Sequence, residues 1–64
     1  MSEEEIEAFI EENKEKGWTR FIKTLHYQRK LKKRLGDMWT KKQERWLNKL
    51  EDYAKDEGLD VPRE

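Results

Sequence analysis

The stretch that decides the fold is residues 35–54, which read LGDMWTKKQERWLNKLEDYA. Its second half sets five apolar or aromatic side chains on one face at helical spacing: Trp46, Leu47, Leu50, Tyr53 and Ala54. This periodicity predicts a helix over residues 38–57 with all five side chains directed at a core. Its first half holds Gly36, a residue that suits the end of a preceding helix. A linker as short as 36–39 predicts that the two helices run antiparallel.

Two residues compete for the start of this helix. Asp37 is a good N-cap, and so is Thr40, which has Gln43 three residues later as in a capping box. If Thr40 is the cap, Lys41 and Lys42 fall in the first turn, where the helix dipole disfavours positive charge. The sequence therefore favours the earlier start at Asp37.

The end of this helix is marked by Gly58. Glycine suits the left-handed position just past a helix, and Leu59 after it is placed to fold back on Ala54 as in a Schellman motif. Val61-Pro62 does not continue a helix, so residues 59–64 are interpreted as a tail.

Two more helices are expected upstream. Residues 3–16 have Ser2 and Glu5 as a capping box, Gly17 as a stop, and a thin apolar face. Residues 19–35 carry an apolar stripe that rotates around the helix, so this helix should cross its neighbours obliquely or contact both. The stripe consists of Trp18, Ile22, Leu25, Leu31 and Leu35.

Three helices of this length with short connections predict an all-α fold, an antiparallel three-helix bundle forming one domain over residues 1–64. The alternative is a helical hairpin that dimerises into a four-helix bundle, which would follow if the first helix docked poorly. We expect a monomer rather than a dimer. The 64 residues include no cysteine, so the core depends on helix packing without a disulfide.

Charge is divided into blocks although the total is zero, with 15 basic and 15 acidic residues. Residues 1–17 carry about −5, residues 18–45 about +8, and residues 46–64 about −3. An acidic first and third helix on either side of a basic second helix would favour the correct pairing and penalise swapped ones. Exposed ion pairs contribute little individually, about 0–1 kcal/mol each.

An enzyme is not expected. His26, the sole histidine, has no carboxylate or second imidazole three or four residues away on its helix, so no metal-ligand spacing is present. The carboxylates lie in solvated runs, and a general acid needs burial to raise its pKa. A chain of this size has no room for a substrate pocket beside its core. We therefore expect no cofactor and no metal. No apolar run is long enough to span a membrane, and the acidic N-terminus is unlike a signal peptide, so a cytoplasmic location is the default.

Two binding roles are left open. The first is a protein-binding module or small helical scaffold that presents aromatic side chains at a helix face; the candidates are Trp18, Tyr27 and Trp39. The alternative is a nucleic-acid-binding module that uses the basic second helix and its extension. Its candidate polyanion contacts are Arg29, Lys30, Lys33, Arg34, Lys41 and Lys42. The basic amphipathic spacing is also that of calmodulin-target peptides, but the same apolar residues are required by a bundle core.

Residues 35–39, Leu-Gly-Asp-Met-Trp, resemble a piece of the HMG-box DNA-binding family near the end of its second helix. The resemblance covers five of 64 residues, and Trp46 breaks the family's spacing to the third helix, so no functional residue is carried over. The composition is typical both of natural mini-domains and of engineered bundles, which leaves the origin open.

Overall fold

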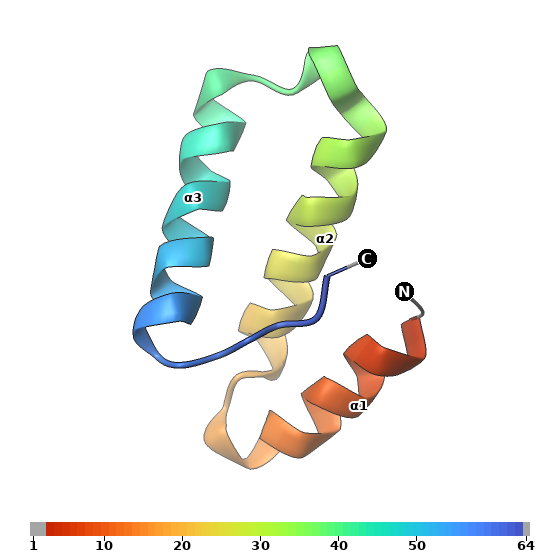
Figure 1. The fold of residues 1–64 in the computed structure, drawn as a ribbon, viewed down its shortest axis with the longest axis vertical. Helices are drawn as coiled ribbons and strands as arrows, with labels where there is room; N and C mark the ends of the chain where they lie inside the picture. The colour runs from red at the N-terminus through yellow and green to blue at the C-terminus, as the bar shows by residue number, and fades with distance from the viewer. Residues whose placement is uncertain (1–2, 64) are drawn as a thin grey trace.

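Residues 3–63, which the structure describes, fold into three α-helices. The computed structural model describes residues 3–63, and within them α1 is Glu3–Asn13, α2 is Thr19–Leu35 and α3 is Lys41–Asp56, with no β-strand in that range (Figure 1). Short 3-10 turns, Lys14–Lys16 and Gly36–Met38, lie in the two connections. The principal extents are 35 × 25 × 15 Å. The prediction of an all-α helical bundle is confirmed.

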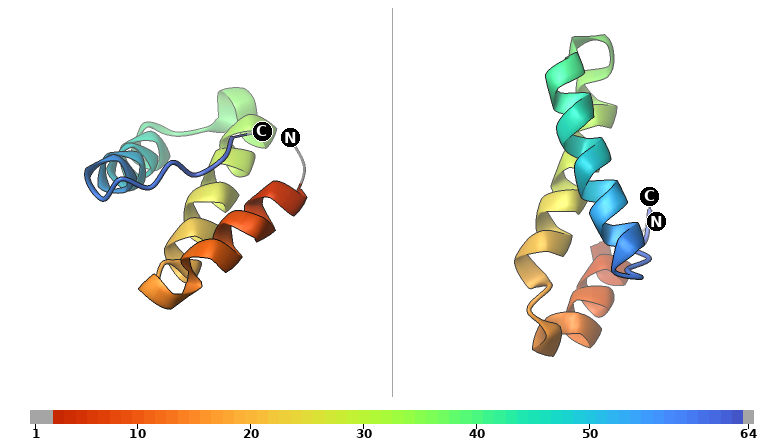
Figure 2. Two further views of the ribbon diagram at one scale, coloured as in Figure 1. Left: turned by 60° about the horizontal axis from the view of Figure 1, so that its bottom comes forward. Right: turned by 90° about the vertical axis from the view of Figure 1, so that its left-hand side faces the viewer.

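The middle helix holds the fold together. α2 packs against α1 on one side and against α3 on another (Figures 1 and 2). α2 and α3 run antiparallel as a hairpin, and α1 crosses α2 at the end remote from the hairpin turn. This arrangement confirms that the rotating apolar stripe of α2 serves two neighbours.

The core is centred on α2. Ile22 and Leu25 are fully buried, and they are the largest side chains to be so among the described residues. A ring of partly buried apolar residues closes around the core, including Trp18 and Trp39. The buried apolar set is Ile6, Ile22, Leu25, Leu47, Leu50, Ala54 and Val61.

The first helix joins this core through Ile6, which is buried, with Phe9 and Ile10 packed beside it. The α-helix ends at Asn13, earlier than the expected Lys16, and the chain continues as a 3-10 turn to Gly17. Asn13 Nδ2 donates to the carbonyl oxygen of Phe9 at 2.8 Å, so this side chain competes for a terminal carbonyl of the helix. The capping box proposed at Ser2 lies outside the described residues.

The expected start of α3 at Asp37 is wrong. Thr40 is the N-cap: its Oγ1 accepts from the Gln43 amide at 3.1 Å, and Gln43 Oε1 accepts from the Thr40 amide at 2.8 Å. Two terminal donors are satisfied by this capping box, which outweighs the weak, solvent-screened penalty of lysines in the first turn. Asp37 lies instead in the 3-10 turn that precedes it.

The predicted end of α3 is confirmed. Gly58 has a φ of +72°, its amide donates to Lys55 at 3.1 Å, and the Leu59 amide donates to Ala54 at 2.8 Å, which is the Schellman pattern. The segment beyond is more than a tail, because Val61 is only 3% exposed and belongs to the core. It leads from the end of α3 across the molecule toward α1 (Figure 1).

The prediction that Trp46 and Tyr53 lie in the core is wrong. The two residues are 49% and 47% exposed. At about 100° per residue, both lie on one flank of the α3 stripe, and Leu47 and Ala54 lie on the other. Leu47 and Ala54 are buried, whereas the flank with the two aromatics is only partly covered. Tyr53 still makes edge-to-face contacts with the rings of Trp18 and Phe21, with centroids 5.7 and 5.1 Å apart.

Candidate functional site

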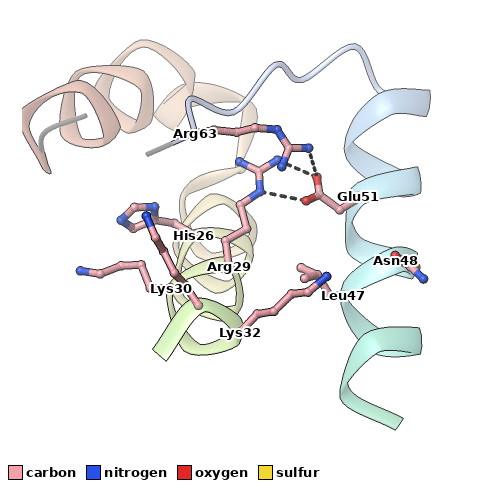
Figure 3. A pocket seen from close by; sticks show the side chains of 9 residues that line it. His26, Arg29, Lys30, Lys32, Leu47, Asn48, Glu51 and Arg63 are labelled. Carbon is pink, nitrogen blue, oxygen red and sulfur yellow. Dashed lines mark hydrogen bonds and ion pairs between the residues drawn. The ribbon is translucent and has the colours of Figure 1, made fainter. Parts of the chain in front are cut away.

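Charged side chains gather in a groove between the two helices of the hairpin (Figure 3). The groove has a volume of about 260 Å3, and basic residues dominate its lining. It is lined by His26, Arg29, Lys30, Lys32, Lys33, Leu47, Asn48, Glu51 and Arg63. The partners of each cation decide which of them are available to a ligand.

Arg29 is engaged within the fold. Its Nε and Nη2 donate to the two carboxylate oxygens of Glu51 at 2.9 and 2.6 Å, and its Nη1 donates to the Val61 carbonyl at 3.0 Å. Arg63 also reaches Glu51, at 3.4 Å (Figure 3). Hydrogen bonds from Arg29 hold the pKa of Glu51 below its usual value. With a side chain only 14% exposed, Arg29 couples α2, α3 and the C-terminal segment, and we assign it to the fold.

Lys30 and His26 of α2 both lie next to the carboxylate of Glu3 in α1. Lys30 Nζ lies 2.7 Å from Glu3 Oε1, and His26 Nε2 lies 3.5 Å from Glu3 Oε2. The hydrogen bond from Lys30 lowers the pKa of Glu3, and His26 acts in the same direction. His26 is buried, and helix spacing gave no sign of this carboxylate because Glu3 comes from another helix.

A third acidic side chain, Glu44, links α3 to the end of α2 and to the connection between them. Glu44 Oε1 accepts from Trp39 Nε1 at 2.8 Å and lies 2.8 Å from Lys32 Nζ. The hydrogen bond from Lys32, followed by that from Trp39, lowers the pKa of Glu44. Trp39, a candidate binding residue, is thus partly buried with its polar atom satisfied internally. Trp18, another candidate, is likewise packed against the core.

Six further cations, between the last turn of α2 and the middle of α3, have no acidic partner in the described part of the chain. Within residues 3–63, no carboxylate lies within ion-pair distance of six exposed side chains that we call the basic end: Lys33, Arg34, Lys41, Lys42, Arg45 and Lys49. Four of them are candidates from the sequence, whereas Arg45 and Lys49 are not among those candidates. Of the two acidic residues in this part of the chain, Asp37 is exposed and Glu44 is already paired.

Two exposed aromatics lie among these cations. Tyr27, a candidate from the sequence, is 59% exposed and lines a hollow of about 410 Å3 with Leu31 and basic residues of α2. Trp46 lines a separate hollow of about 340 Å3 whose other walls are Lys42, Arg45 and Lys49. Trp46 is not among the site residues predicted from the sequence, because its helical spacing indicates a core position.

Comparison with protein-family models, with curated proteins and with solved structures finds no match for this chain. In the part of the chain that the structure describes, no three histidine or acidic side chains are grouped as a metal site would require. No helix in that part is both long and apolar enough to cross a bilayer.

Proposed function

We propose that this chain is a non-enzymatic nucleic-acid-binding module, and that its contact surface is the basic end of the α2–α3 hairpin. The observation that supports this most is that six exposed cations, between the last turn of α2 and the middle of α3, have no acidic partner among residues 3–63. A dense set of unneutralised lysines and arginines attracts phosphates and releases their counterions on binding.

The neutral total charge does not oppose this proposal. α1, which carries six glutamates, packs on the half of α2 remote from the hairpin turn (Figure 1). Exposed charges separated by more than about 10 Å are largely screened at physiological salt. The acidic side chains that do approach the basic segment, Glu3, Glu44 and Glu51, are each held by a cation of their own. A phosphate chain at the basic end would therefore meet a locally positive surface.

A charge-matched pair of triple variants tests the proposal. The first changes Lys33, Lys41 and Lys42 to Gln at the basic end. The control changes Lys16, Lys23 and Lys55 to Gln; these are also exposed and have no ion pair in residues 3–63, but they lie outside the basic end. Binding of labelled single- and double-stranded oligonucleotides would be followed by fluorescence anisotropy over a range of salt concentrations.

The basic-end variant should lose affinity, and its slope of log K against log salt should fall by about 2–3, because each lost phosphate contact removes about 0.7–0.9. The control variant should keep the slope of the unmodified protein. Equal behaviour of the two variants, or no binding of either oligonucleotide at low salt, would count against the proposal.

A protein-binding module is the second candidate. It is favoured by Tyr27, which is exposed beside Leu31 in a hollow rimmed by Lys30, Lys33 and Arg34. Such a face suits an acidic segment of another protein, with the ring as its anchor. Binding of an acidic peptide would support this candidate over the first if Tyr27→Ala abolished it and added nucleic acid did not compete with it.

A further inference from the structure

We infer that Trp46 is a base-stacking platform, and that the ligand of the basic end is therefore a single-stranded nucleic acid. This inference rests on the function proposed above and adds the strand type and the residue that selects it. Trp46 is 49% exposed although it is the largest side-chain type, and this exposure leaves ring surface open to a ligand.

The surroundings of Trp46 indicate the chemistry of its ligand. The hollow of about 340 Å3 is formed by Trp46 with Lys42, Arg45 and Lys49, which stand four and one residues before it and three after it. Residues three or four apart are neighbours on a helix surface, so Lys42 and Lys49 each lie next to both Trp46 and Arg45. One aromatic ring bordered by three cations combines a stacking surface for a base with partners for the flanking phosphates.

Other occupants fit this surface less well. A second copy of the chain docked ring to ring would bring Lys42, Arg45 and Lys49 against the same three cations, and like charges in contact are penalised. An anchor tryptophan of a protein interface is expected within an apolar, fully desolvated surrounding, whereas the other walls of this hollow are all cationic. In a duplex the bases are stacked on each other, so a side chain on the surface of α3 could reach the phosphates but not the face of a base. A single strand has both free bases and phosphates.

The first test uses the unmodified protein with two probes of about 12 nucleotides, within the range of single-strand site sizes. One is oligothymidine and the other is an abasic strand with the same backbone. Stacking predicts that oligothymidine binds about 5- to 150-fold more tightly, while the two salt slopes agree because the phosphates are the same. Equal affinity for the two strands would overturn the inference.

The second test assigns the effect to a residue. Trp46→Leu should reduce oligothymidine affinity by about the same factor and leave abasic-strand affinity unchanged, whereas Trp46→Phe should keep most of the preference because it retains an aromatic face. Tyr27→Leu is the matched control, since Tyr27 is also an exposed aromatic with lysines and an arginine beside it. Circular dichroism would verify that each variant is folded.

The outcomes separate this inference from the function on which it depends. Loss of binding in the basic-end variant, with no effect of Trp46→Leu, would overturn the stacking platform and leave the proposed function standing. A preference that is lost with Tyr27→Leu but kept with Trp46→Leu would place the platform on α2 and overturn the assignment to Trp46. Tighter binding of an acidic peptide than of oligothymidine would overturn both.

Discussion

Replacement of Arg29 by Met should destabilise the protein more than any change at the basic end. Met keeps much of the apolar stem of the side chain but removes the guanidinium, which makes two hydrogen bonds to Glu51 and one to the Val61 carbonyl. Loss of hydrogen bonds to a charged group costs about 1.5–3 kcal/mol, and up to about 5 kcal/mol where a buried pair is broken. Because Arg29 and Glu51 are 14% and 24% exposed, we expect about 2–3 kcal/mol.

This loss is large for a chain of 64 residues, whose total free energy of unfolding is expected to be about 3–10 kcal/mol. It should lower the melting temperature by roughly 8–24 °C, measured by circular dichroism with urea titrations alongside. The control is Arg34→Met, an exposed arginine without an ion pair in residues 3–63, for which we expect a change within about 0.5 kcal/mol. Equal effects of the two substitutions would refute the assignment of Arg29 to the fold.

The double variant Arg29→Met, Glu51→Met should recover much of the loss, because no charge is then left unpaired.

Three further predictions concern the helix ends and the acid range. Thr40→Ala should cost about 1 kcal/mol in urea unfolding because the capping box is lost, whereas Asp37→Ala should be nearly neutral; the reverse order would restore Asp37 as the cap. Gly58→Ala should cost about 1–2 kcal/mol from the left-handed backbone alone, since an added Cβ would meet no atom within 4 Å, and a neutral result would contradict this. Arg29 lowers the pKa of Glu51 in the folded protein. The ionised Glu51 therefore stabilises the folded state above pH 4.5, the ordinary pKa of a glutamate, and this stabilisation is lost as the pH falls through the lowered pKa of Glu51. Urea midpoints measured from neutral pH down to about pH 3 should therefore fall below about pH 4.5, and less steeply for Arg29→Met; parallel curves would exclude this linkage.

Features set by neighbouring residues could be predicted from the sequence. Gly58 and Leu59 form the expected Schellman motif because its hydrogen bonds join residues only a few positions apart. The start of α3 was predicted wrongly because two local effects oppose each other there. The helix dipole disfavours Lys41 and Lys42 in the first turn, but the Thr40–Gln43 capping box is the stronger effect.

Features that depend on packing could not be predicted in this way. Arg29 and Glu51 are 22 residues apart, and helix periodicity carries no signal for a pair between different helices. The exposure of Trp46 follows from which flank of the α3 stripe is covered, and helix periodicity assigns both flanks to the same apolar face. The basic character of the candidate site was apparent from the sequence, but the division between paired and unpaired cations required the positions of Glu3, Glu44 and Glu51.

The position of Val61 in the core has a consequence for biosynthesis. The ribosome delivers the three helices first, but the last buried apolar group and the carbonyl that receives Arg29 belong to residue 61. In a nascent chain that has emerged only as far as the end of α3, the core around Ile22 and Leu25 would lack Val61, and Arg29 would lack the carbonyl acceptors of Val61 and Pro62. The native packing of the core is thus completed only after residue 61 has left the exit tunnel.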